Sequence, residues 1–139
     1  MRVVIFILTA TVSAVAGCSS ATDPAADAEV EFTFGIQRLA IEPAFMVESI
    51  GGDVVVRGTY EALTSGYTAE ASADLSAGTI ELRVVGTQPD NNHPVVVATG
   101  YEATVRGVSP GRTHIRVIHE YRGVNRPPAV VFEQALPVQ

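Results

Sequence analysis

The fold class is indicated most clearly by residues 101–121, YEATVRGVSPGRTHIRVIHEY. Two strands with a turn between them are predicted within this stretch. On either side of position 110, apolar and polar side chains alternate, which is typical of a strand with one buried face. Pro110 and Gly111 supply the fixed and the free backbone angle that a tight reversal needs. We therefore predict a pair of strands joined by this turn, with an apolar face that a second sheet must cover.

The same alternation recurs in short segments along the rest of the chain. We predict strands at 29–34, 53–60, 67–74, 79–85 and 129–138, and a short strand that begins at 94 and is interrupted at Gly100. Residues 37–48 are consistent with a further strand broken at Pro43. Turn residues separate the segments, and none of the segments has a helical period. The pattern predicts an all-β fold, a two-sheet antiparallel sandwich of roughly seven to nine short strands.

A family resemblance adds to this prediction. The segment Val108-Ser-Pro-Gly-Arg-Thr113, followed by alternation, is similar to the E–F corner of immunoglobulin-like and fibronectin type III domains. The resemblance implies an immunoglobulin-like sandwich and covers about residues 53–138. The chain departs from the family in that Thr113 stands where a corner Tyr is common. It also lacks the intersheet Cys pair and the core Trp of antibody domains.

The amino terminus, MRVVIFILTATVSAVAGCSS, has the layout of a secretory signal. Arg2 precedes an uncharged apolar stretch, 3–15, which is shorter than the about 20 residues that a membrane-spanning helix needs. The stretch ends in Val15-Ala16-Gly17-Cys18, and these residues resemble the lipobox of bacterial lipoproteins. The resemblance implies cleavage between Gly17 and Cys18 and a diacylglycerol on the thiol of Cys18.

The cysteine count agrees with this interpretation. Cys18 is the only Cys, so an intramolecular disulfide is excluded, and lipidation explains why an exported chain has an unpaired thiol. The alternative is an ordinary signal peptide with an incidental Cys. We expect a signal peptide at 1–17, an acylated Cys and flexible tether at 18–28, and one domain at 29–139. Since Ser19 replaces the Asp that retains lipoproteins at the inner membrane, the resemblance implies outer-membrane sorting in a host with two membranes.

The charge balance limits the partners. The formal net charge is −6, and phosphates repel an acidic domain, so we expect no nucleic-acid binding. For the same reason we do not expect the domain surface to adhere to anionic lipid. The predicted partners are the lipid bilayer, through acylated Cys18, and an envelope protein or glycan.

One cationic stripe is a candidate for recognition. Arg112, His114, Arg116 and Arg122 have the same parity in an extended strand and therefore share one sheet face. Such a face is suited to an anionic peptide, glycan or partner surface. The alternative is cross-strand ion pairing, for which the expected partners are Glu102, Glu120 and Glu133.

The remaining polar residues predict neither catalysis nor a bound metal or cofactor. His114 and His119 have opposite parity, and His119 is expected to point inward and form a hydrogen bond in the core or at its rim. The loop Asp90-Asn-Asn-His93 offers oxygen ligands, but its spacing lacks a calcium-binding pattern. The motifs of hydrolases, nucleotide-binding loops and zinc sites do not occur.

The expected function is therefore a non-catalytic binding or structural module, exported and membrane-anchored at the cell envelope. Two alternatives are an accessory subunit or assembly factor of an envelope complex, and a small envelope hydrolase.

Overall fold

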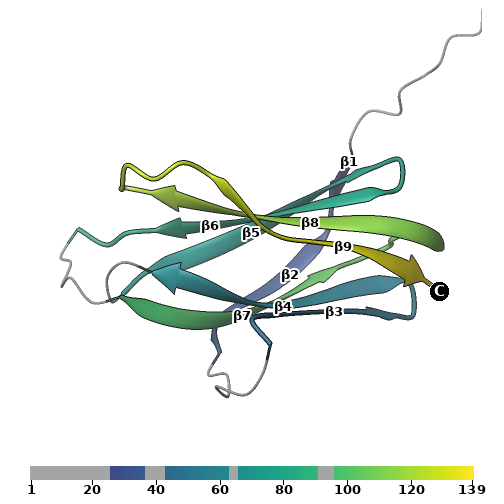
Figure 1. The fold of residues 1–139 in the computed structure, drawn as a ribbon, viewed down its shortest axis with the longest axis horizontal. Coiled ribbons are helices and arrows are strands. Elements are labelled where there is room, and N and C mark those ends of the chain that lie inside the picture. Colours follow the sequence, from purple (N-terminus) through teal and green to yellow (C-terminus); the bar gives the residue numbers. More distant parts are fainter. Residues whose placement is uncertain (1–25, 37–42, 63–65, 91–95) are drawn as a thin grey trace, which may run out of the picture.

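The computed structural model describes residues 26–36, 43–62, 66–90 and 96–139, and these ranges form a sandwich of two sheets (Figure 1). The strands are β1 (Ala26–Ala28), β2 (Val30–Ile36), β3 (Phe45–Ile50), β4 (Asp53–Ala62), β5 (Thr68–Ser76), β6 (Thr79–Thr87), β7 (Val97–Val105), β8 (Gly111–Arg122) and β9 (Ala129–Val138). One sheet has the order β1-β5-β6-β8-β9 and the other the order β2-β7-β4-β3. The predicted all-β, two-sheet sandwich is confirmed, and the nine strands of the described ranges fall within the predicted number.

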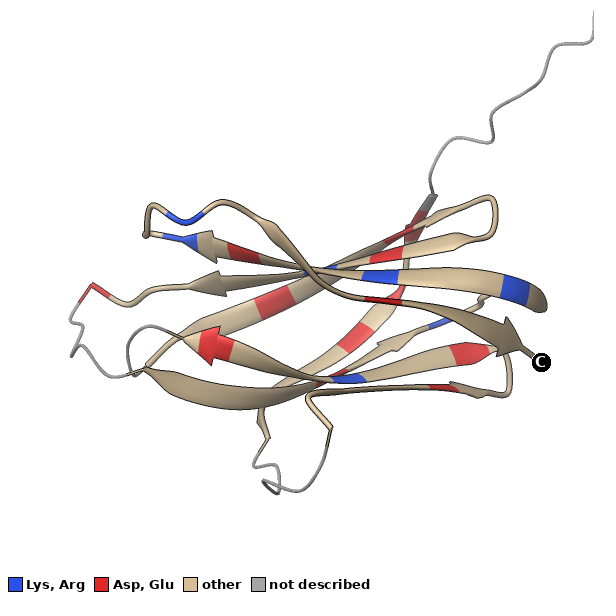
Figure 2. Ribbon diagram, viewed as in Figure 1, with Lys and Arg blue, Asp and Glu red and all other residues tan. Residues whose placement is uncertain are grey.

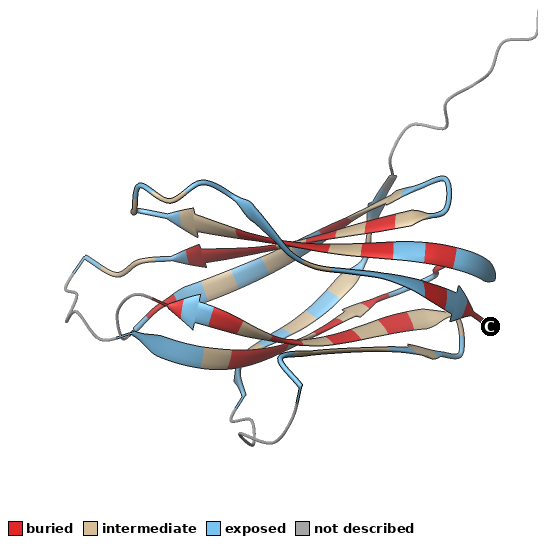
Figure 3. Ribbon diagram, in the orientation of Figure 1, coloured by how far each residue is buried: buried red, intermediate tan, exposed pale blue. Residues whose placement is uncertain are grey.

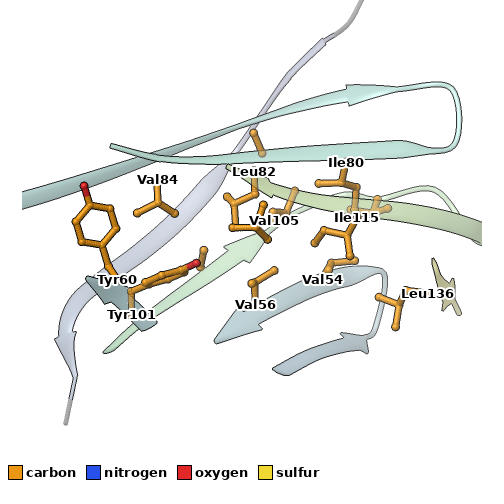
Figure 4. Close-up of a cluster of buried hydrophobic side chains, with 14 of the residues drawn as sticks. Val54, Val56, Tyr60, Ile80, Leu82, Val84, Tyr101, Val105, Ile115 and Leu136 are labelled. Atoms are coloured by element: carbon orange, nitrogen blue, oxygen red, sulfur yellow. The ribbon is translucent and has the colours of Figure 1, made fainter. Parts of the chain in front are cut away.

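Alternation of side chains explains why these segments form strands. Charged residues are spread along the strands of both sheets (Figure 2), and buried residues alternate with less buried ones, most clearly in β4 (Figure 3). In β4, for example, Val54, Val56 and Tyr60 are fully buried, as predicted. The same holds for Ile80, Leu82 and Val84 in β6. Near the β3–β4 and β5–β6 turns the core is aliphatic, and toward the opposite end of the sandwich it contains Tyr60 and Tyr101 (Figure 4).

The two strands of residues 101–121 do not form the predicted pair. β7 belongs to the four-stranded sheet and β8 to the five-stranded sheet, so the segment between them crosses from one sheet to the other. The connection, 106–110, is longer than a tight turn; within it Gly107 adopts a positive φ of 68° and the side chain of Val108 is buried. The amide of Val108 donates to the carbonyl oxygen of Gly52 at 2.9 Å. The two apolar faces therefore cover each other instead of lying side by side under another sheet.

One strand pair departs from the predicted antiparallel arrangement. β6 and β8 are parallel neighbours, with Leu82 opposite Val117. The reason is that β7, which lies between them in the chain, is placed in the other sheet. The chain therefore crosses over before it returns, and a crossover of this kind produces parallel strands.

Several boundaries also differ from the prediction. Residues 26–28, assigned to the tether, form β1 and pair with 73–75 of β5, so the sandwich begins three residues earlier than expected. β7 runs through Gly100 without the predicted interruption, and β6 extends to Thr87. Part of the uncertain segment 37–48 is β3, whereas 37–42 lie outside the described residues.

Two tyrosine rings occupy the space left by two glycines. The ring of Tyr101 lies over Gly58, its partner on the adjacent strand β4. The ring of Tyr60 reaches across the sandwich to Gly86 of β6, and its hydroxyl donates to the carbonyl oxygen of Glu120 at 2.7 Å. A β-carbon at either glycine would overlap the ring that covers it. The fold therefore needs a glycine at both positions, because the rings are fully buried and cannot move aside.

We predict that Gly86→Ala lowers the free energy of unfolding by about 1–3 kcal/mol, because the new methyl group forces Tyr60 out of its position. Urea denaturation of the variant and of the unaltered protein measures this difference. Ser72→Ala, on the exposed face of β5, is the control and should stay within about 0.5 kcal/mol of the unaltered protein. Equal midpoints for Gly86→Ala and the control would show that the contact with Tyr60 does not constrain the fold.

Candidate functional site

Three chain reversals meet at one end of the sandwich, which we call the corner end. They are the β3–β4 turn at 50–52, the β5–β6 turn at 76–78 and the connection 106–110 between β7 and β8. Backbone hydrogen bonds hold them together: the Val108 amide donates to Gly52, and the His114 amide donates to the carbonyl oxygen of Gly78 at 2.8 Å. All three reversals lie at the right-hand side of Figure 1.

An open groove of about 600 Å³ lies at the corner end, between the β5–β6 turn and the start of β8. Its lining is mostly apolar and includes Leu75, Ile80 and Val108. The polar side chains that line it are those of Ser76, Thr79, Ser109, Arg112 and Thr113. An apolar groove with a few hydroxyls and one guanidinium is suited to a ligand that has an anionic group attached to an apolar body.

Arg112 differs from the other arginines that the structure describes, because it has no carboxylate partner among the described residues. The others are all ion-paired, namely Arg57, Arg83, Arg106, Arg116, Arg122 and Arg126. Arg112 is exposed and lies opposite Pro137 of β9, which carries no charge. Its positive charge is therefore available to a group outside the chain.

The structure divides the predicted cationic stripe into two parts. Arg116 pairs with Glu133 at 2.7 Å, as the pairing alternative proposed, and Arg122 pairs with Glu70 at 2.6 Å. His114, like Arg112, is exposed and forms no ion pair within the described ranges. Arg112 and His114 are two positions apart on the same face of β8, so their side chains are neighbours. These two residues are the available part of the stripe.

The predicted carboxylate partners are only partly correct. Glu133 does pair with the stripe, but Glu102 binds Arg57 on the other sheet and Glu120 binds Arg83 of β6. The acid that pairs with Arg122, Glu70, lies on β5. Sequence parity places a residue on a face but not next to a particular partner, because the partner depends on strand order.

The two described histidines lie on opposite faces, as predicted. His114 is exposed, whereas His119 is 3% exposed and its Nε2 lies 3.0 Å from the hydroxyl of Tyr101, with which it forms a hydrogen bond. Burial, assisted by the positive charge of Arg126, lowers the pKa of His119 from 6.5 to about 4. His119 is therefore neutral at physiological pH and belongs to the core, between the rings of Tyr60 and Tyr101.

The loop that begins at Asp90 is only partly described. Asp90 itself is exposed, and Asn91, Asn92 and His93 lie outside the described residues. Within the part of the chain that the structure describes, three or more His, Cys, Asp or Glu side chains do not gather in a metal-binding arrangement.

The described residues contain no helix of the length and apolarity required to cross a membrane.

Comparison with known proteins gives no relative: no protein-family model, curated protein or solved structure has significant similarity to this chain.

We predict that the protein loses stability as the pH falls from 6.5 to 4, because the unfolded chain protonates His119 more readily than the folded protein does. Above pH 6.5 His119 is neutral in both states and none of this stability is lost. Between pH 6.5 and 4 its protonation in the unfolded chain lowers the free energy of unfolding by about 3 kcal/mol. Denaturant midpoints at closely spaced pH values measure the slope.

Two variants separate His119 from the carboxylates that titrate over the same range. His119→Gln should have a shallower slope than the unaltered protein, most clearly between pH 6.5 and 5. His114→Gln removes an exposed histidine from the same strand and should keep the original slope. Identical slopes for both variants would refute the assignment to His119.

Proposed function

We propose that this chain is an exported lipoprotein, anchored at the cell envelope through Cys18, and that its sandwich is a non-catalytic binding or structural module. The observation that carries the proposal is the sequence Val15-Ala16-Gly17-Cys18, in which the only Cys of the chain follows a short apolar signal segment. A thiol at this position becomes the attachment point for acyl chains, and two or more chains give a stable membrane anchor.

The packing of the sandwich supports a binding or structural role. Two polar side chains of its interior are already occupied within the protein: Tyr60 donates to the carbonyl oxygen of Glu120, and Tyr101 is hydrogen-bonded to His119. The available polar side chains are instead at the surface, where Arg112 lines the groove and His114 lies beside it. This arrangement is suited to recognition of an anionic group.

We predict that Cys18→Ala abolishes acylation and releases the protein from the membrane fraction. The mature unaltered protein should begin at Cys18 and have the added mass of its acyl chains, because the signal peptidase cleaves at a lipidated Cys. Intact-mass spectrometry and membrane partition measure both properties. Ser19→Ala changes the neighbouring residue and should remain acylated and membrane-bound. A soluble, unacylated mature protein would contradict the anchor.

An accessory role in a larger envelope complex is the second candidate, and the edge strand β9 favours it. Val130 and Val131 are 47% and 37% exposed on this strand, next to a register shift in the pairing with β8. β9 is the last strand of its sheet, so its outer backbone groups are free to pair with a strand of another protein.

We predict that a partner bound in this way is lost when Val131 is replaced by Glu, because the charge opposes burial at the edge. Affinity purification from membranes, with the stoichiometry of each co-purifying protein, tests this. Ala135→Glu places the same charge at another exposed position farther along β9. Its effect on partner binding shows how much of the strand the partner contacts. A protein that is purified alone and migrates as a monomer would exclude the accessory role.

A further inference from the structure

The chain enters the sandwich at the corner end. Ala26, the first described residue, is opposite Leu75 in the register of β1 and β5. Leu75 lines the groove together with Arg112. In Figure 1, β1 accordingly lies beside the β5–β6 turn, at the same end as the start of β8. The segment that leads back to Cys18 therefore leaves the domain near the groove.

The length of that segment limits which part of the domain can reach the membrane. Eight peptide steps separate position 18 from position 26, and their fully extended length is about 28 Å. The strand β8 has 12 residues and spans about 40 Å, so the opposite end of the sandwich lies farther from Ala26 than the tether can extend. If Cys18 is held in the bilayer, the corner end is the end nearest to it.

The residues at the tips of the corner end are suited to a lipid surface. The segments 50–52, 76–78 and 106–112 contain no carboxylate, and their charged residues are Arg106, which pairs with Glu31, and Arg112, which is unpaired within the described ranges. Ile50 is 57% exposed at the tip of the β3–β4 turn. In Figure 2 the turns at this end are correspondingly tan, with a blue band near the start of β8. A guanidinium binds phosphate oxygens, and an exposed apolar side chain at the same end of the domain can enter the headgroup region.

The nearest carboxylates indicate which lipids this end accepts. Asp53 accepts a hydrogen bond from the amide of Gly107 at 3.1 Å and lies 3.9 Å from Arg106, so its charge is locally balanced. Asp27 and Asp74 are opposite each other on β1 and β5, one register step behind Leu75. Two acids so close to the surface oppose a strongly anionic bilayer. Zwitterionic headgroups, which have a phosphate but no net charge, avoid that repulsion.

The contact does not need to be strong. A tether of this length keeps the domain at a high local concentration at the bilayer, so an interaction too weak to bind a free domain is sufficient to orient a tethered one. One arginine and one isoleucine are consistent with such an orienting contact.

We propose that the corner end of the sandwich rests on the membrane, with Arg112 bound to the phosphates of zwitterionic lipids and Ile50 in the headgroup region. The proposal depends on anchoring through Cys18 and names the bilayer as the partner of Arg112. It also fixes the orientation of the molecule: the start of β9, which lies opposite His119, the loop at Asp90 and the far end of β8 face away from the membrane (Figure 1).

Fluorescence quenching in vesicles tests this orientation. The full-length protein is expressed and acylated, then reconstituted into phosphatidylcholine vesicles that contain a headgroup-attached quencher. A single Cys is introduced at Ala77, at the corner end, or at Asp90, at the opposite end, and is labelled; the thiol of Cys18 is blocked by its acyl group. Both residues are exposed, so neither substitution disturbs the core. We expect quenching at position 77 to exceed that at position 90 at least twofold.

Substitutions then identify the side chains responsible. Arg112→Gln combined with Ile50→Ser should reduce the quenching at position 77 about twofold. Arg122→Gln removes an ion-paired arginine from the far end of the same strand and should leave the quenching unchanged. No effect of the double variant would overturn the assignment to Arg112 and Ile50.

The outcomes separate this proposal from the proposed function on which it depends. Equal quenching at positions 77 and 90 in a protein with the correct acyl mass overturns the orientation and leaves the anchor intact. A protein without acyl mass overturns both. Self-quenching at position 77 that increases with protein density, in vesicles without the lipid quencher, would show that a second copy covers this end and would also overturn the proposal.

Discussion

The contact between Tyr60 and the backbone of Gly86 is the interaction on which the spacing of the two sheets depends. The chain has one Cys and cannot form a disulfide within itself, so only complementary inner faces hold the sheets together. Tyr60 fills the space above Gly86 and hydrogen-bonds to the backbone of β8, so one side chain connects strands of both sheets. Toward the corner end the core is aliphatic and includes Ile80, Ile115 and Val54 (Figure 4). The core thus has an aromatic half and an aliphatic half.

The corner between β7 and β8 determines the remaining topology. Once β7 completes the four-stranded sheet, the chain must cross to the other sheet, and β8 then becomes a parallel neighbour of β6. The crossing is secured by the buried side chain of Val108 and by its backbone hydrogen bond to Gly52. The same crossing separates the start of β8 from the β5–β6 turn, and the groove lies between them. The groove is therefore a consequence of how the chain changes sheets.

The sequence predicts the strands of this fold better than their neighbours, for a physical reason. Alternation reports which side chains are buried, so the inward positions of β4 and the opposite directions of His114 and His119 were predicted correctly. Alternation does not report which sheet a strand joins. Two successive strands can pair within one sheet or lie in two facing sheets, and the apolar face of each is buried in both cases. For that reason 101–121 was assigned as a pair, although Val108 was an apolar residue at an otherwise polar connection. The pairing of Arg116 with Glu133 is predicted correctly, but that of Arg122 with Glu70 is not, because these two residues are 52 positions apart and only strand order brings them together.

Net charge and local charge lead to different expectations for the surface of this protein. The total of −6 argues against contact with anionic lipid, and the outer faces of both sheets agree, since their arginines are occupied by carboxylates. An ion pair of this kind contributes little to stability, but it removes a cation from the set that a partner can bind. Arg112 remains available because its partner on β9 is Pro137 and the first β6 residue paired with β8 is Thr79, opposite His114, and neither Pro137 nor Thr79 carries a negative charge. Among the described arginines of this acidic domain, one is therefore left unpaired, and it lies at the end where β1 begins.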